Sequence, residues 1–586
     1  MDPQCASGHD VLFNDFRADP SCLALKKYNE LGLSLADLLE IQKILPILYP
    51  WDSDYLKYQS AVNRRFTVFP IGIVMAATRE DVVNGFNFAR KYDLPFSLRG
   101  GSHNAEGYCL SSGIIIDQSK RTGIHVDHPT RDHRRGGVSS DKRSTHQGGH
   151  DFALVTLEAG ALIGPTAEKL AEQGLAIPSG TCPNVGQIGL ALAGGIGFLT
   201  REFGLTADSV VSVELITASG EIIVADEHHH PDLFWALRGS GGGNYGIVLS
   251  MVIKAYYLRD VCLAELVYSK RQAAKVLHEW EHWAPYTDYR ISSDFVIRGR
   301  PSTSPTGGSS VDDPPDGTTV TVEAEFASGD IKEFTALLEP MLRLGPKSKN
   351  IRRVDYLDAM RNFAGEGRWQ PFFKLKNGFV QTPMTRDTMK SFLRSLNAPA
   401  GVTYSVRCEV MGLRGAVVPC DDLNSSHHRE STVIDSHDRN HSEIVDSSRG
   451  RRHSVSDDSD GPIFDRPKRK PRGISSSKVA SHKTSREKSL PADHSQGSFA
   501  HRDSIYWVLI NVQWTNQEIS ERALNFADSV YQSVAKSLHG AYVGQADAQL
   551  EDYLHEYYGD SLRKLIQVKR EYDPHNIFRY PQGIPV

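Results

Sequence analysis

The chain has 586 residues, a formal net charge of −5 and 40% hydrophobic residues. This length accommodates two or three domains with a large core, and the slightly acidic charge gives no electrostatic reason to expect binding to nucleic acid or to an anionic membrane. The first residues show no basic stretch followed by an apolar one, and no run approaches 18 apolar residues. We therefore expect neither a secretory signal nor a membrane-spanning helix.

The cysteines point to a reducing compartment. There are seven of them, an odd number, and their spacing is irregular. This usage is unlike a disulfide framework and favours an intracellular, cytoplasmic protein. If the N-terminus is incomplete and the native protein is secreted, a bridge between Cys5 and Cys22 is the alternative.

The predicted elements change character along the chain. Residues 1–51 have the apolar spacing of helices. From residue 55 to 256, short β-branched runs alternate with helical stretches and glycine-rich turns, which indicates α/β construction. Residues 261–415 have less glycine and are predicted to form a second domain. The clearest strands are expected at 66–69, 113–117, 153–157, 210–216 and 505–514, and the clearest helices at 79–92, 165–173 and 516–538.

Two segments are predicted to be disordered insertions. Residues 128–150 contain one aliphatic residue, and residues 421–498 contain 18 serines, seven histidines and no Trp or Tyr. Such segments bury too little apolar area to offset the entropy of the chain. The basic stretch 467–472 matches a nuclear-localisation patch, but a solvated stretch in a Ser-rich loop is the favoured interpretation.

Three glycine-rich blocks carry the chemical signal. The block 98–107 (LRGGSHNAEG) follows an apolar run, and consecutive glycines let backbone N–H groups converge on phosphate oxygens. Viewed alone, His103 in this block is an ordinary loop histidine. The block 178–198 is more specific, because Cys182 precedes a series of glycines that allow a planar ring or a pyrophosphate to approach the backbone. A third block, 232–246, adds another glycine turn before a strand.

These blocks, with 556–578 near the end of the sequence, resemble the berberine-bridge-enzyme-like flavoproteins. Their FAD-binding domain is of the type found in p-cresol methylhydroxylase (PCMH) and vanillyl-alcohol oxidase. The resemblance implies an α+β fold of two domains. A discontinuous FAD domain would comprise 52–260 and 541–586, and an antiparallel-sheet substrate domain would comprise 261–540.

The resemblance also implies FAD bound covalently through two side chains. His103 matches the histidine that bonds the flavin 8α-methyl carbon, and Cys182 matches the cysteine that bonds ring carbon C6. Imidazole and thiolate are nucleophiles suited to an electron-poor ring. Ser102 stands where the family more often has a third glycine. Further cofactor contacts are expected from Arg99, Gly100, Gly101, Ser102, Asn104, Gly107, Val185, Gly186, Gly189, Gly194, Gly195, Gly197, Asp208, Ile247, Asn576 and Phe578.

Two further positions bear on the electron acceptor and on the catalytic base, and the second of them departs from the family pattern. Val185 matches a position where valine permits oxygen access in related plant enzymes, so O2 is the expected acceptor. The family's second tyrosine in Tyr-x-Asn-Tyr-x-Asp is replaced by Gln545, which cannot accept a proton at neutral pH. The base is then expected to be Tyr542 or Tyr506. Asn511 and Gln513, on the same predicted strand as Tyr506, are expected to line the substrate face with it.

The leading prediction is an FAD-linked oxidase that takes a hydride from a small organic substrate and releases H2O2. The substrate would be an alcohol, an amine or an allylic carbon of a specialised metabolite. One alternative is a carbohydrate oxidase that forms a lactone, and another is a flavin-binding scaffold protein without turnover. No metal site is expected, because consecutive residues such as His228–His230 rarely converge on one ion. The sequence indicates no oligomeric state.

Overall fold

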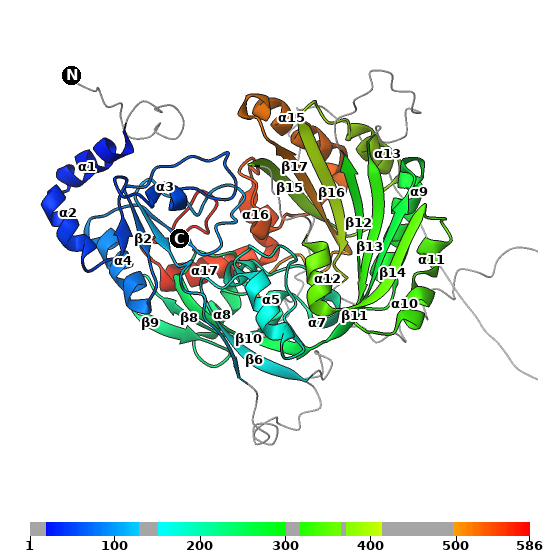
Figure 1. Ribbon diagram of the computed structural model, residues 1–586, viewed down its shortest axis with the longest axis horizontal. Coiled ribbons are helices and arrows are strands. Elements are labelled where there is room, and N and C mark those ends of the chain that lie inside the picture. Colours follow the sequence, from blue (N-terminus) through cyan, green and yellow to red (C-terminus); the bar gives the residue numbers. More distant parts are fainter. Residues whose placement is uncertain (1–18, 128–150, 300–316, 365–370, 413–495) are drawn as a thin grey trace, which may run out of the picture. The chain divides into compact units, whose positions relative to one another are not determined.

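Three β-sheets organise the part of the chain that the computed structural model describes, which is residues 19–127, 151–299, 317–364, 371–412 and 496–586 (Figure 1). These residues belong to one compact unit. The predicted insertion 128–150, the basic stretch 467–472 and all but the last three residues of 421–498 lie outside the described ranges, and so does Cys5.

The first sheet has four strands in the order β1-β2-β4-β3. β2 and β3 both pair with β4 in parallel, whereas β1 pairs with β2 antiparallel. The strand expected at 66–69 does not form, because pairing begins only after Pro70, which has no N–H to donate. Helices α1, α2 and α4 share the buried core of this sheet. The elements are α1 (Pro20–Glu30), α2 (Leu35–Gln42), β1 (Ile47–Leu48), α3 (Tyr55–Tyr58), β2 (Gly72–Met75), α4 (Arg79–Lys91), β3 (Phe96–Arg99) and β4 (Ile114–Asp117).

The second sheet has six strands and is antiparallel in each of its described pairings. Its path is β5-β6-β10-β8-β9, and β7 pairs with β10. The alternation of strands and helices in the sequence therefore did not mean a parallel sheet throughout this region. The elements are β5 (Ile124–Asp127), β6 (Phe152–Glu158), α5 (Ile163–Ala171), β7 (Leu175–Ala176), α6 (Gln187–Leu192), α7 (Thr200–Phe203), β8 (Val210–Ile216), β9 (Ile222–Ala225), α8 (Pro231–Ala236) and β10 (Ile247–Tyr257).

The third sheet has seven antiparallel strands in the order β14-β11-β13-β12-β16-β17-β15. One face packs on helices α9, α13 and α15 (Figure 1) and forms the largest buried core. The opposite face carries polar side chains that line a cavity, among them Arg407, Glu409 and Asn511. The strands are β11 (Asp260–Tyr268), β12 (Ile291–Gly299), β13 (Thr319–Phe326), β14 (Ser348–Asp355), β15 (Phe372–Val380), β16 (Val402–Val410) and β17 (Tyr506–Trp514), and the helices are α9 (Ala273–Trp283), α10 (Ile331–Leu337), α11 (Glu339–Leu342), α12 (Tyr356–Phe363), α13 (Arg386–Ser395) and α15 (Ser520–Val534).

The last described segment returns to the second sheet. Helices α16 (Tyr553–Tyr558) and α17 (Leu562–Tyr572) contribute Tyr557, Leu565 and Val568 to the core that the six-stranded sheet forms. The fully buried Lys569 ammonium donates to Asp573 and to the carbonyl oxygens of Asn244 and Phe578. The chain therefore has an α+β architecture in which segments far apart in sequence build one core.

Within the described ranges, no helix is long and apolar enough to cross a membrane. The same residues contain no group of three or more His, Cys, Asp or Glu side chains arranged to hold a metal ion.

Candidate active site

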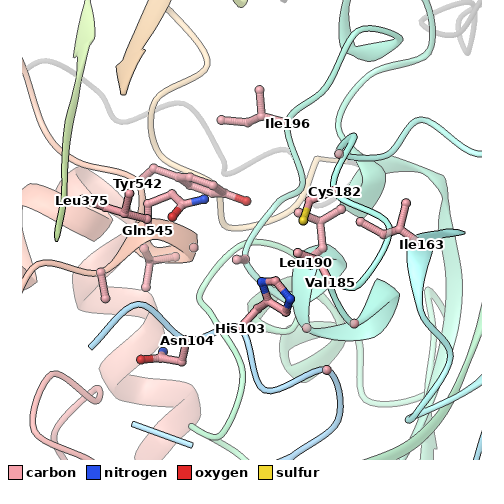
Figure 2. A pocket seen from close by; sticks show the side chains of 18 of the residues that line it. His103, Asn104, Ile163, Cys182, Val185, Leu190, Ile196, Leu375, Tyr542 and Gln545 are labelled. Atoms are coloured by element: carbon pink, nitrogen blue, oxygen red, sulfur yellow. The ribbon is translucent and has the colours of Figure 1, made fainter. Parts of the chain in front are cut away.

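A single cavity of about 1250 Å³ brings most of the predicted site residues together (Figure 2). Its walls are the loop after β3, the loop before α6, the glycine turn after α8, the segment 542–546 and the polar face of the seven-stranded sheet. Pockets for small ligands usually measure about 300–1,000 Å³. This cavity is large enough for a dinucleotide together with a small substrate.

The loops that carry His103 and Cys182 touch at their backbones. A Cβ on Gly101 would lie 2.3 Å from the Gly186 nitrogen, so a side chain there would force the two loops apart. His103 and Cys182, one from each of these loops, both line the cavity (Figure 2). Burial lowers the pKa of His103 to about 4, which leaves its imidazole neutral at physiological pH.

Ser102, next to His103, has a φ of 63°, in the left-handed region. Glycine reaches this region without the Cβ clash that other residues incur, which explains why glycine is frequent at this position in the resembled family. The loop is held in place by the Asn104 side-chain oxygen, which accepts from the Glu106 and Tyr108 amides at 3.1 and 3.0 Å.

Arg99 lines the cavity, but its charge is already paired. Its Nε donates to Asp117 at 2.7 Å and its Nη2 donates to the Tyr58 carbonyl at 2.6 Å. Arg99 therefore fixes the end of β3 and adds little net positive charge to the cavity.

Tyr542 and Gln545 lie across the cavity from His103 (Figure 2). The Tyr542 hydroxyl accepts from the Gly195 amide at 3.1 Å, and burial raises its pKa well above the usual range. The Asn377 side chain on β15 holds this segment: its Oδ1 accepts a hydrogen bond from the Tyr542 amide at 2.6 Å, and its Nδ2 donates one to the Gln545 carbonyl at 2.8 Å. A tyrosine held this way is a poor base at neutral pH.

The placement of Tyr506 corrects the sequence prediction. Tyr506 is fully buried on the helix-covered face of the seven-stranded sheet, where its hydroxyl donates to Glu281. Asn511 and Gln513 do line the cavity, on the opposite face. Successive side chains of a strand point to opposite faces, so an even-numbered residue of β17 could not share a face with 511 and 513.

The polar face of the sheet carries paired charges around one carboxyl group. Arg407 forms an ion pair with Asp294, and its Nη2 lies 3.5 Å from Glu323 Oε2. The other carboxylate oxygen of Glu323 accepts a hydrogen bond from Arg298 Nη2 at 2.7 Å. Glu409, two residues further along β16, is 6% exposed and lines the cavity. Burial raises its pKa to about 7, although Arg407 acts in the opposite direction. Glu409 is also near enough to Tyr542 to raise the pKa of that phenol.

Several predicted cofactor contacts pack elsewhere. Gly194 and Gly195 face Phe499 and Thr206, and a Cβ on Gly197 would meet the Ser179 carbonyl, so these glycines allow close packing behind the cavity wall. Asp208 pairs with Arg502. The predicted residues that do not line the cavity are Gly107, Gly194, Gly195, Gly197, Asp208, Ile247, Asn576 and Tyr506, and those that line it are Arg99, Gly100, Gly101, Ser102, His103, Asn104, Cys182, Val185, Gly186, Gly189, Tyr542 and Phe578.

Sequence reasoning missed Glu409 and Arg407. The signal was present as polar residues at alternate positions in Val402–Val410, with Ser405, Arg407 and Glu409 on one face. The glycines 241–243 and Tyr580 also line the cavity and were not assigned.

The residues present fit FAD. A Cβ on Gly189, which lines the cavity, would meet no atom within 4 Å, so its absence enlarges the open space. A neutral histidine and a thiol line the cavity from two touching loops, and the glycine turn 241–243 supplies a stretch of its lining without side chains. This combination suits a flat ring at one end and a pyrophosphate at the other.

Comparisons with known proteins agree with this fit. Residues 70–226 match the family described as FAD binding domain, and residues 541–585 match the family described as Berberine and berberine like. The uncharacterized FAD-linked oxidoreductase YgaK of Bacillus subtilis (strain 168) is 28% identical over 542 residues, which cover 91% of this chain and 95% of that protein.

Solved structures share the fold. BBE-like 1 of Physcomitrella patens has a TM-score of 0.66 at 20% identity and covers 92% of this chain and 96% of its own. The xylooligosaccharide oxidase from Myceliophthora thermophila C1, in complex with xylobiose, has a TM-score of 0.66 at 18% identity, with coverage of 93% and 98%.

The FAD-binding family match and the FAD-linked relative together identify an FAD-dependent oxidoreductase. The second family match and the similarity to YgaK support, more narrowly, a berberine-bridge-enzyme-like oxidoreductase, and the structural neighbours share its fold.

Proposed function

We propose that the chain is an oxidase that holds FAD covalently through His103 and Cys182 and oxidises a small polar organic substrate with O2 as the acceptor. The observation that carries this proposal is the composition of one cavity. Two nucleophiles lie on one side of it, and a buried carboxyl group lies on the polar wall that closes it.

Two features support double attachment. The neutral state of His103 leaves a nitrogen lone pair for bond formation, and the contact between Gly101 and Gly186 fixes the spacing of the two loops. When bound, the flavin supplies a hydride acceptor at N5 and passes two electrons on.

Glu409 is the candidate base. A carboxyl group with a pKa of about 7 holds and releases a proton at physiological pH, which is the condition for general-base catalysis. It faces the cavity from β16, where a substrate hydroxyl or amine would lie between the sheet and the flavin site. Arg407 orients this part of the wall through its pairs with Asp294 and Glu323.

The polar wall favours a hydroxylated substrate over an apolar one. Arg298, Ser405, Asn511 and Gln513 provide donors and acceptors along the sheet face. This favours alcohol oxidation and keeps carbohydrate oxidation to a lactone as the second candidate. A flavin-binding scaffold without turnover is disfavoured, because a carboxyl group buried in the cavity wall costs stability and only a catalytic protein needs one there.

Val185 supports O2 as the acceptor. It lines the cavity three residues after Cys182, and its carbonyl accepts from the Ile163 amide at 3.0 Å, which fixes its place in the wall.

The test is to incubate the purified protein with panels of alcohols, amines and reducing sugars and to measure peroxide. Peroxide with alcohols or amines supports the leading proposal, and peroxide confined to reducing sugars supports a carbohydrate oxidase that forms a lactone. Flavin that no panel member reduces under anaerobic conditions supports the scaffold. Acid precipitation and peptide mapping test the attachment, since yellow colour in the supernatant would exclude covalent FAD.

A further inference from the structure

A buried ion-pair network lies just outside the cavity, where three segments meet. Lys374 of β15 places its ammonium nitrogen 2.5 Å from Glu106 Oε1 and 2.5 Å from Asp547 Oδ1. The Lys374 and Glu106 side chains are 1% and 2% exposed. Lys374 therefore bridges two carboxylates that come from opposite ends of the sequence.

Both carboxylates belong to segments that form the cavity wall. Glu106 follows His103 by three residues, and Asp547 follows Gln545 by two. Lys374 itself lies between Phe373 and Leu375, which both line the cavity. One ammonium group thus joins the histidine loop, the segment opposite it and the substrate sheet.

Backbone contacts strengthen the same junction. The Asn63 side-chain amide donates to the Ala105 carbonyl at 2.7 Å and to the Phe373 carbonyl at 3.0 Å. Arg65 also donates to the Phe373 carbonyl, at 3.2 Å, and lies 3.8 Å from Glu106. Ala105 and Phe373 pack in one apolar cluster. The histidine loop is consequently fixed to β15 rather than only to its own sheet.

A neighbouring lysine provides a natural comparison. Lys376 pairs with Asp547 at 3.0 Å and with Asp528 of α15 at 2.8 Å, and among the described residues neither of these ion pairs reaches the histidine loop. Burial acts to raise the pKa of Asp547, yet the two ammonium groups hold it below its usual range. The two lysines share one carboxylate and differ in whether they reach Glu106.

We propose that Lys374 is a positioning residue that holds the His103 loop against the substrate sheet, so that His103 is set for bonding to the flavin. The flavin part of this inference rests on the proposed function. The structural part does not, since it concerns the order of residues 100–108.

The experiment compares Lys374→Met with Lys376→Met in the full-length holoenzyme. Removing one partner of a buried pair leaves an uncompensated charge and loosens the segment that carries it. In Lys374→Met we expect amide hydrogen exchange in 100–108 to accelerate about tenfold or more. In Lys376→Met we expect exchange there to stay as in the unmodified chain. Equal exchange of 100–108 in Lys374→Met and the unmodified chain would overturn the proposal.

Peptide mapping gives a readout that general destabilisation would not produce. Lys374→Met is expected to lower the fraction of flavin bound through His103 while the fraction bound through Cys182 persists. An equal loss at both positions would contradict a role specific to the histidine loop. If the unmodified chain shows no flavin at His103, covalent attachment there fails, and the exchange comparison still decides the positioning role.

A second variant serves if Lys374→Met does not fold. The double variant Glu106→Gln/Lys374→Met removes both charges and leaves Asp547 paired with Lys376. Faster exchange in 100–108 is expected again, and unchanged exchange would count against the proposal.

Discussion

At the residue scale, the chemistry of the cavity depends on which face of a strand each side chain occupies. Glu409 and Tyr506 lie on adjacent strands, β16 and β17, yet one faces the cavity and the other the helix-covered core. Tyr506 donates to Glu281, whose pKa burial raises to about 7 although the hydrogen bond acts against it. Of these two carboxyl groups with similar pKa values, only Glu409 faces the cavity.

Replacing Glu409 by Gln is expected to lower kcat by about 10²–10⁴-fold, the usual contribution of a general base, with flavin content unchanged. In the unmodified enzyme kcat/KM should rise as the pH rises through about 7, because the carboxylate form is the base. This limb should be absent in Glu409→Gln. Steady-state rates from pH 5 to 9 provide the check.

Two controls accompany that variant. Glu265→Gln makes the same change at an exposed residue of the same cavity, and Tyr506→Phe removes one of the two tyrosines that the sequence predicts as the base. Both should keep the pH limb near 7. A limb that disappears in Tyr506→Phe and persists in Glu409→Gln would reverse the assignment.

Replacing Val185 by Leu is expected to slow peroxide formation at limiting oxygen by roughly tenfold, which corresponds to about 1.4 kcal/mol of barrier. The larger side chain would fill space in the wall beside Cys182, whereas anaerobic reduction by substrate should be unaffected. Val543→Leu is the matched control, because Val543 lines the same cavity next to Tyr542 and away from Cys182 in the sequence. Equal oxygen dependence in the two variants would remove Val185 from the oxygen path.

At the element scale, caps and one buried arginine hold the framework around the site. Helix α4 begins at a capping box, in which Thr78 accepts from the Asp81 amide and Asp81 accepts from the Thr78 amide. Arg201 of α7 is fully buried, and its guanidinium donates to five carbonyl oxygens in residues 284–291. Arg201 thereby joins the segment after the glycine block 178–198 to the turn between α9 and β12.

Thr78→Ala is expected to reduce the free energy of unfolding by about 1 kcal/mol, because the Asp81 amide loses its acceptor at the start of α4. Thr335→Ala is the matched control, since Thr335 lies within α10, is half-buried and donates to the Ile331 carbonyl four residues earlier rather than capping the helix. Its effect should stay within about 0.5 kcal/mol. Denaturant titration of both variants measures the difference, and equal effects would argue against the cap.

At the scale of the whole molecule, buried carboxyl groups make folding depend on pH. Glu325 of β13 is 1% exposed, burial raises its pKa to about 8, and its Oε1 has no hydrogen-bond partner in the described part of the chain. The unfolded chain releases this proton at about pH 4.3, whereas the folded chain keeps it up to about pH 8. Between these values the folded state binds one more proton, so stability falls as the pH rises.

Glu325→Gln should remove this dependence. The unfolding free energy of the variant minus that of the unmodified chain is expected to increase by about 1.4 kcal/mol per pH unit from about pH 5 to 8, and to level off above pH 8. Denaturant titrations at pH 5, 6, 7, 8 and 9 measure this difference. A difference that stays constant across the range would mean that Glu325 is ionised in the folded chain.

The local elements were largely predictable, because their signals are local. The helix expected at 79–92 forms as Arg79–Lys91, and the strand expected at 210–216 forms as Val210–Ile216. The strand predicted at 66–69 does not form, because Pro70, which follows it directly, has no N–H to donate to a neighbouring strand. Tyr506 was misassigned because residue type was considered without the side-chain period of two.

The sequence by itself determined the cofactor class and the glycine blocks, and it singled out His103 and Cys182 as the proposed attachment points, since these depend on motifs whose residues are close together along the chain. Only the tertiary structure decided what faces them. Glu409, Lys374 and Asp547 lie hundreds of residues from His103. The pairing order of the seven-stranded sheet and the return of the last segment to the second core bring Glu409 into its cavity and the other two just outside it. Their roles arise from burial and from charges on other segments, and neither property is encoded at a fixed spacing in the sequence.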